Sequence, residues 1–154
     1  MKGRTLPCIL LGIATALLCC YCVLITKTLV LSGENEQIFL KVPVWDGSQF
    51  SVTFIHSVHK SPLTDYYEIH GKDIYVIKTK YFDFGAGVQT ELEDGQKLEY
   101  TPDGGMLISG FHQKMNPLIY VVGMVSDHTL KVNQRIYSLR DICGRGAEVT
   151  FSVE

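Results

Sequence analysis

An uncharged, apolar run of twenty residues, Leu6 to Ile25, constrains this chain more than any other feature of its sequence. At about 1.5 Å of rise per residue, a helix of that length spans about 30 Å, the thickness of the hydrocarbon core of a bilayer. The run is longer than the apolar part of a cleaved secretory signal, and no Ala-x-Ala-like cleavage site follows it. The sequence therefore predicts an uncleaved signal anchor with one transmembrane helix within residues 1–31.

Basic residues flank the predicted span unequally. Lys2 and Arg4 precede it, and only Lys27 follows it. Since basic residues near a span stay preferentially in the cytoplasm, we expect a single-pass protein of the cell membrane with a cytoplasmic N terminus. Residues 32–37 are polar and predict a short tether, which leaves residues 38–154 as one extracytoplasmic domain.

The part of the chain expected outside the cytoplasm is small and acidic. The 123 residues from Ser32 to Glu154 suffice for one domain with a modest core. They carry 11 Lys and Arg against 16 Asp and Glu. This charge argues against nucleic acid as a partner and against electrostatic binding to anionic lipid, because both partners are themselves negative. We therefore expect the N-terminal helix, and not charge, to hold the protein at the membrane.

Four of the five cysteines lie in the predicted anchor, and Cys143 alone lies outside it. The domain therefore has no partner for an internal disulfide, and packing must stabilise it. The anchor cysteines Cys8, Cys19, Cys20 and Cys22 are expected to pack as small apolar residues and not to bind metal. For Cys143 we favour a buried or inert thiol over an intermolecular disulfide.

The rest of the sequence predicts β-structure. The segment from Ala147 to Glu154 alternates apolar and polar residues without a break, as a strand with one buried face does. One helical turn is expected at Ser138–Cys143, where Ser138 caps the N-terminal end and Gly144 ends the turn. Further runs rich in β-branched and aromatic residues are Ile38–Val44, Phe50–Val58, Ile74–Phe82, Leu118–Val122, Tyr66–Ile69, Lys97–Thr101, Met106–Ser109, Leu130–Val132 and Arg135–Tyr137.

Turns that contain glycine separate these runs, as tight hairpins require. We therefore expect an all-β fold: a single small sandwich or barrel-like domain of about eight to ten short antiparallel strands.

His56 lies in a segment that departs from ordinary strand-and-turn sequence. Alternation along the predicted strand places it on the same face as Val52 and Phe54. A buried imidazole needs a hydrogen-bond partner. Two interpretations follow: a core histidine bonded to a carboxylate or carbonyl, which we favour, or the inner wall of a pocket.

Catalysis and metal binding are not favoured. His56 and Ser57 are adjacent and face opposite sides of a strand, so they cannot act on each other as base and nucleophile. His112 and His128 are available, yet their spacing indicates no triad and no Gly-x-Ser-x-Gly turn occurs. His56 and His59 also face opposite sides, which argues against chelation. We expect no catalytic residue, metal or cofactor; the alternative is a hydrolase-like cell-envelope enzyme or a metal-binding protein that uses His56 or His128.

A second unusual segment contains Gly85-Ala86-Gly87. No helical pattern follows it, so it does not resemble a nucleotide-binding loop. These glycines are expected to permit a tight crossing or a bulge, or to turn backbone N–H groups toward a ligand.

The unusual segments belong to a larger set of ordered motifs, which resembles a known bacterial family. The motifs are His56-Ser57-Val58, Pro62, Asp65, Tyr67, Phe82, Gly85-Ala86-Gly87, Gly123 and Asp127-His128-Thr129-Leu130. In this order they are similar to the family called domain of unknown function 1850, and the resemblance extends from about Ile38 to Val153. It implies a short membrane-anchored extracytoplasmic domain associated with tripartite ATP-independent periplasmic (TRAP) transporters of the TAXI type.

The resemblance thus implies a non-catalytic accessory or binding module that contacts the transporter's permease or its solute receptor. The sequence departs from the family's pattern in three places: an acidic residue is common where His59 stands, Glu is more usual than Asp65, and a proline often follows the glycine where Met124 stands. An acidic side chain at position 65 is expected to be able to pair with His56. The candidate binding or structural residues are His56, Ser57, Pro62, Asp65, Gly85, Gly87 and His128.

Overall fold

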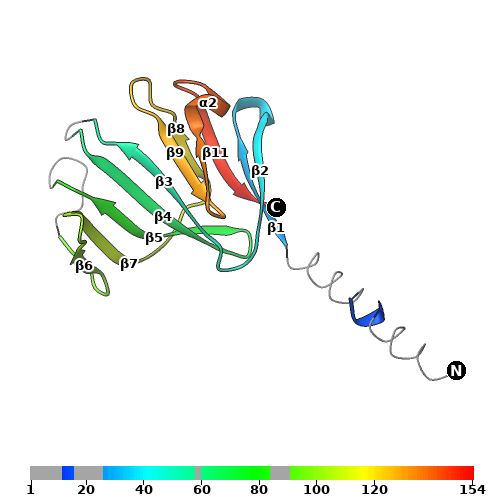
Figure 1. Cartoon of the computed structure of the whole chain (residues 1–154), viewed down its shortest axis with the longest axis horizontal. Coiled ribbons are helices and arrows are strands. Elements are labelled where there is room, and N and C mark those ends of the chain that lie inside the picture. Colours follow the sequence, from blue (N-terminus) through cyan, green and yellow to red (C-terminus); the bar gives the residue numbers. More distant parts are fainter. Residues whose placement is uncertain (1–11, 16–25, 58–59, 84–90) are drawn as a thin grey trace, which may run out of the picture.

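Two antiparallel β-sheets make up the domain in the computed structural model, which describes residues 12–15, 26–57, 60–83 and 91–154 (Figure 1). Within these ranges eleven strands form one sheet of four strands and one of seven, packed as a sandwich. Neither sheet closes into a barrel. The predicted all-β class is confirmed, and of its two forms the sandwich is the one observed.

The four-stranded sheet has the order β2-β1-β11-β8. Strand β11 (Glu148–Val153) is the one that the sequence predicted most clearly: Val149, Phe151 and Val153 are buried and alternate with more exposed residues. The strands of this sheet are β1 (Lys27–Ser32), β2 (Ile38–Val44), β8 (Leu118–Val121) and β11 (Glu148–Val153).

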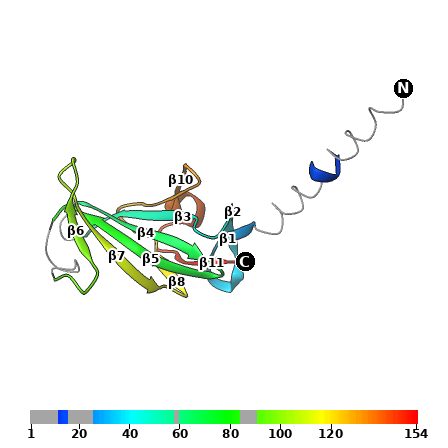
Figure 2. The same ribbon diagram turned by 90° about the horizontal axis from the view of Figure 1, so that it is seen from below.

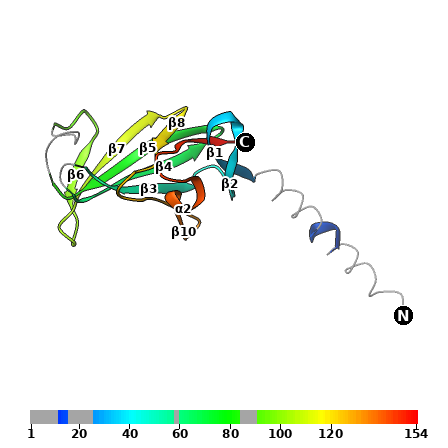
Figure 3. The same ribbon diagram turned by 90° about the horizontal axis from the view of Figure 1, so that it is seen from above.

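The seven-stranded sheet has the order β10-β9-β3-β4-β5-β7-β6. It is wider than the small sheet and extends past it toward β6 (Figures 2 and 3). Its strands are β3 (Gln49–Ile55), β4 (Pro62–His70), β5 (Asp73–Tyr81), β6 (Lys97–Tyr100), β7 (Met106–Lys114), β9 (His128–Val132) and β10 (Arg135–Ser138).

The single helical turn expected near the C terminus is present as α2 (Leu139–Cys143). The side chain of Ser138 accepts a hydrogen bond from the backbone N–H of Asp141 at 3.0 Å, as a capping residue does. Gly144 follows with a φ of 92°, which favours glycine and ends the turn.

Strand β1 was not predicted, and it corrects two of the sequence assignments. Lys27–Ser32 was assigned mainly to the anchor, but it pairs with β2 on one side and β11 on the other. The next residues, expected as a tether, form the connection from β1 to β2, which contains a 3-10 turn at Glu34–Glu36. The physical reason is that Leu29-Val30-Leu31, each at most 3% exposed, is a continuous apolar run of the kind that a fully buried strand requires.

The predicted transmembrane span is not tested by the part of the chain that the structure describes. Only residues 12–15 of the run Leu6–Ile25 are described, and they are helical. Across the described ranges, no helix combines the length and the apolar character needed to cross a bilayer. The anchor cysteines lie outside the described residues.

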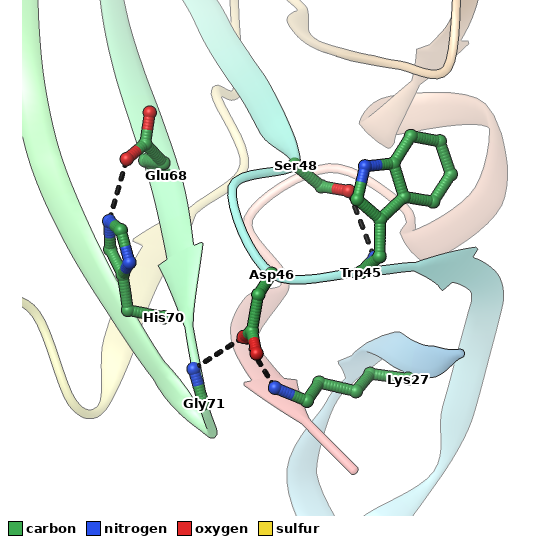
Figure 4. Close-up of polar contacts among 7 residues, drawn as sticks. All are labelled: Lys27, Trp45, Asp46, Ser48, Glu68, His70 and Gly71. Carbon is green, nitrogen blue, oxygen red and sulfur yellow. Dashed lines mark hydrogen bonds and ion pairs between the residues drawn. The ribbon is translucent and has the colours of Figure 1, made fainter. Parts of the chain in front are cut away.

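Both ends of the domain meet at one end of the sandwich, beside the start of β1 (Figure 1). Thr28 and Glu154 exchange backbone hydrogen bonds of 3.0 and 2.9 Å. The ammonium group of Lys27 bonds to the Asp46 carboxylate, which also accepts the backbone N–H of Gly71 at 2.7 Å (Figure 4). The bond from Lys27 and that from Gly71 hold the pKa of Asp46 below its usual value. The start of β1 is therefore attached to the connection between β2 and β3, which is itself bonded to the turn between β4 and β5.

Gly110 in β7 provides a test of the irregular pairing in the large sheet. It has a φ of 91°, and a Cβ atom there would lie 2.3 Å from the carbonyl oxygen of Gly95. We expect Gly110→Ala to lower the free energy of unfolding by about 2–3 kcal/mol, from backbone strain and overlap together. Gly104→Ala is the control, because Gly104 has a φ of 83° but open space around it. Urea unfolding that shows equal losses for the two variants would contradict the close approach.

Candidate functional site

One row of residues crosses all seven strands of the large sheet on a single face. Directly opposed residues in antiparallel strands point to the same side, so the whole row lies on one side of the sheet. Its members at the β9 and β3 positions are fully buried between the sheets, but two central members are polar: Asp65 and Thr79. From β10 to β6 the row is Tyr137, Leu130, Val52, Asp65, Thr79, Ile108 and Leu98.

Hydroxyl groups surround the Asp65 carboxylate. The Thr79 hydroxyl donates to Oδ1 at 2.7 Å, and the Tyr120 hydroxyl donates to Oδ2 at 3.1 Å from the opposite sheet. The hydroxyl oxygens of Tyr67 and Tyr120 are 2.5 Å apart. Since the hydrogen of Tyr120 is directed to Asp65, Tyr67 donates to Tyr120. The bonds therefore run from Tyr67 through Tyr120 into the carboxylate.

The Asp65 carboxylate has no compensating cation among the described residues. Burial raises its pKa above the usual value, and the bonds from Thr79 and Tyr120 only partly oppose this effect. None of the ion pairs found in the described ranges involves Asp65. Burial, reinforced by the negative charge of Asp65, raises the pKa of both Tyr67 and Tyr120, so both phenols remain neutral donors.

A cavity of about 350 Å³ lies beside this network, and we call it the acid cavity. Asp65, Tyr67 and Thr79 contribute its polar groups together with Gln113. Asp65 is the only charged residue among the described residues that line it. The rest of its lining is apolar or aromatic and comes from β3, β4, β5, β7 and the residue after β7: Phe54, Leu63, Val76, Tyr81, Ile108, Phe111 and Met115.

A second hollow of about 540 Å³ adjoins the acid cavity, and Phe54 and Leu63 line both. It lies where β3 ends and β9 begins, and we call it the histidine pocket. His56, Ser57 and His128 line it, so the structure brings three of the predicted site residues together. Its other lining residues are Ile55, Lys60, Gly123, Met124, Val125 and Ser126.

His128 is held in one orientation at the start of β9. Its Nδ1 accepts the backbone N–H of Gly123 at 3.1 Å, and its ring stacks on Phe54 with centroids 5.0 Å apart. Burial lowers the pKa of His128, although the charge of Asp127 opposes the effect. A neutral imidazole whose Nδ1 accepts a bond carries its hydrogen on Nε2. His128 therefore offers the pocket a donor and not a base.

The pKa of His128 can be measured by NMR titration of its ring protons. We expect a value below 6.5, because burial disfavours the imidazolium. Asp127→Asn is expected to lower the value further, since it removes the charge that favours the imidazolium. A rise in the pKa of His128 in this variant would contradict the arrangement.

The remaining predicted residues are placed as follows. His56 is partly buried and lies just after β3, because that strand ends at Ile55 and not at Val58. Its backbone N–H donates to the carbonyl of Ser61 at 2.9 Å. Pro62 opens β4, is exposed and pairs with Ile55. Gly85 and Gly87 lie outside the described residues.

The pairing of Asp65 with His56 that the resemblance raised is not among the bonds of Asp65 in the structure, which go to Thr79 on the adjacent strand and to Tyr120 in the other sheet. The physical reason is the alternation of β4, which turns Asp65 toward the acid cavity. His112 stacks on Tyr75 with centroids 4.5 Å apart and lines neither hollow. Across the described ranges, no three His, Cys, Asp or Glu residues are grouped so as to hold a metal.

Cys143, at the end of α2, is a free thiol that is partly buried against the main core. Burial raises its pKa to about 11. Since the thiolate is the reactive form, such a thiol reacts slowly at neutral pH. These observations agree with the inert thiol that was one of the two forms the sequence favoured, while Cys143 is only partly buried.

Sequence reasoning did not identify the network around Asp65. One signal was available: Leu63, Asp65, Tyr67 and Ile69 alternate along β4, so Asp65 belongs to an otherwise apolar face. Tyr120 gave no such signal, because it reaches Asp65 from the other sheet and is 55 positions away in the chain.

The stability of an Asp65→Asn variant tests the environment of this carboxylate. We expect the variant to be more stable than the parent at pH 7, by about 1 kcal/mol, because folding no longer buries a charge. In the parent, the folded state binds the proton more tightly, so its stability increases as the pH falls through the raised pKa of Asp65. The advantage of the variant should therefore disappear near the unfolded value of 3.8.

Asp103→Asn is the matched control for this experiment, measured by urea unfolding between pH 3 and 7. Bonds from Lys80 and Thr101 lower the pKa of Asp103 to about 2, so its replacement should destabilise the protein at pH 7. The two variants are thus expected to change stability in opposite directions. A loss of stability at pH 7 in Asp65→Asn would contradict the described environment.

Comparison with known families gives one match: the domain of unknown function called DUF1850 matches residues 50–139. The match covers more than half of the chain and includes every described residue that lines the acid cavity and the histidine pocket. No curated protein and no solved structure matches the chain significantly.

Proposed function

Because the chain belongs to the DUF1850 family, to which no function is assigned, we propose a role for it from its site and its sequence. We propose that it is a non-catalytic, membrane-anchored extracytoplasmic module that binds a small ligand and acts as an accessory to a TAXI-type TRAP transporter.

The acid cavity is the observation that carries the binding role. Ligand sites are concave, largely apolar and equipped with a few converging polar groups. The acid cavity has this composition, with Asp65, Thr79 and Tyr67 among aromatic and aliphatic lining residues. Its volume of about 350 Å³ suits a small molecule.

The arrangement of the polar groups supports binding over catalysis. In the acid cavity the hydroxyls donate into Asp65, and the raised pKa values of Tyr67 and Tyr120 leave no activated nucleophile. In the histidine pocket the Nδ1 of His128 already accepts a backbone N–H. Its Nε2 therefore carries the hydrogen and has no lone pair with which to activate Ser57.

A cell-envelope enzyme is the second candidate, because His56, His128 and Ser57 do line one pocket. If it is correct, His56→Ala and His128→Ala should each lower turnover by at least about a hundredfold, the scale of general acid–base catalysis. Unchanged turnover of an esterase or phosphatase substrate by both variants would remove this candidate.

The membrane and transporter parts of the proposal are supported by the sequence. The apolar run Leu6–Ile25 is long enough to span a bilayer, and the ordered motifs resemble a family whose members look like transporter accessories. Strand β1 begins at Lys27, two residues after that run. In this arrangement the domain lies against its membrane, so its partner is expected in or on the same membrane.

Crosslinking of intact membranes tests the accessory role. We expect the full-length chain, purified after crosslinking, to carry a fused TRAP permease or its solute receptor, identified by mass spectrometry. An unrelated single-pass protein expressed at the same level is the control for random encounters. Recovery of neither transporter subunit, or equal recovery with the control, would refute the association.

A further inference from the structure

We propose that the acid cavity binds a small organic cation: an ammonium group held by Asp65, with an apolar body held by the aromatic lining. This inference rests on the binding role proposed above and names the class of ligand for it.

The negative charge in the acid cavity favours a cationic ligand. Asp65 is the only charged residue among the described residues of the lining, and no Lys, Arg or His is included there. An ionised carboxylate away from water is costly unless an opposite charge accompanies it. A ligand with an ammonium group supplies that charge, and the carboxylate can accept its hydrogens.

The hydrogen-bond network prepares Asp65 to act as an acceptor. Thr79 donates to Oδ1 and Tyr120 to Oδ2, so each oxygen receives one bond and keeps further acceptor capacity. Tyr67 directs its hydrogen to Tyr120 and thereby fixes the direction of that bond. Donors on both oxygens favour the carboxylate form and so oppose the effect of burial, which favours the protonated acid.

The aromatic residues of the lining also suit a cation. Phe54, Tyr67, Tyr81 and Phe111 surround the same space as Asp65. The face of an aromatic ring attracts a cation, and the attraction increases where water is excluded. An anionic ligand would instead meet the Asp65 charge with no basic residue of the described lining to hold it.

Three probes of similar size separate the charge of the ligand from its shape. They are 2-phenylethylamine, which is cationic at pH 7, the neutral 2-phenylethanol and the anionic phenylacetate. Their binding to the full-length protein in detergent is measured by isothermal titration calorimetry at pH 7. We expect the amine to bind at least about tenfold more tightly than the alcohol, and phenylacetate to bind most weakly.

Asp65→Asn tests the residue that selects the charge. The amide has nearly the shape of the carboxylate, so the cavity remains while the charge is lost. We expect its preference for the amine over the alcohol to fall to within about twofold, while Asp103→Asn, an exposed acid outside the cavity, keeps the full preference. Thermal unfolding of each variant shows that it is folded.

Three outcomes would overturn the inference: equal binding of the amine and the alcohol, a preference for the amine that survives in Asp65→Asn, or no binding of any probe. If the amine and the alcohol bound equally, the preference for a cation would be refuted, but the proposed role in binding a small ligand would remain. The transporter association is tested separately by crosslinking. If that association were refuted, the ligand selectivity determined by calorimetry would not be affected.

Discussion

A chain that begins at Ile38 is expected not to fold, whereas a chain that begins at Thr26 is expected to fold. The shorter chain lacks β1, which lies between β2 and β11 in the small sheet. Leu29, Val30 and Leu31 would be lost with it, and each is at most 3% exposed. Removal of one buried Leu side chain costs about 2–5 kcal/mol. The loss of all three side chains would therefore cost about as much as the entire free energy of unfolding of a typical domain, about 5–15 kcal/mol.

Circular dichroism and the dispersion of amide NMR signals would distinguish the two chains. Both lack the apolar run Leu6–Ile25, so they differ only in residues 26–37 and the comparison isolates β1 and its connection to β2. Cooperative unfolding of the Ile38 chain at the same temperature as the Thr26 chain would contradict the central place of β1.

Phe151→Ala is expected to lower the free energy of unfolding by about 3–5 kcal/mol, measured in urea. Phe151 in β11 is 1% exposed and connects the two sheets. Its ring stacks on Phe50 of the large sheet with centroids 5.6 Å apart, and it meets the edge of Tyr120 at 6.1 Å. The substitution therefore leaves a cavity at the centre of the core and removes one support of Tyr120, which bonds to Asp65.

Tyr100→Ala is the control for this substitution, because Tyr100 is an aromatic residue of strand β6 that is 73% exposed. Its loss should change stability by less than about 1 kcal/mol. Similar losses in the two variants would mean that Phe151 does not occupy the core position described. Weaker binding of 2-phenylethylamine by a folded Phe151→Ala protein would further connect the core to the acid cavity.

Local patterns in the sequence predicted ten of the eleven strands in the described ranges, together with the capped turn at Ser138. This was feasible because alternation and capping depend on near neighbours in the chain. Strand β1 was missed since Leu29-Val30-Leu31 continues the apolar character of the predicted span, and composition alone does not separate a buried strand from the end of a membrane helix.

In the candidate site, too, the features that depend on near neighbours in the chain were predictable from the sequence, and those that depend on pairing between distant segments were not. The inward direction of Asp65 follows from alternation along β4, whereas its bond to Tyr120 depends on the packing of one sheet against the other. His56, Ser57 and His128 meet in the histidine pocket because β3 pairs with β9, which brings Phe54 opposite His128. No spacing within the sequence indicates that pairing.

The bond between Lys27 and Asp46 restricts how the domain could rotate relative to the predicted membrane span. With β1 starting two residues after the predicted span and Lys27 bonded to Asp46 in the connection between β2 and β3, the domain would have little freedom to rotate relative to that span. Strand β3 runs from that end to the histidine pocket, and its seven residues cover about 20 Å. In the proposed topology, the length of β3 would therefore set the distance between the lipid surface and the histidine pocket.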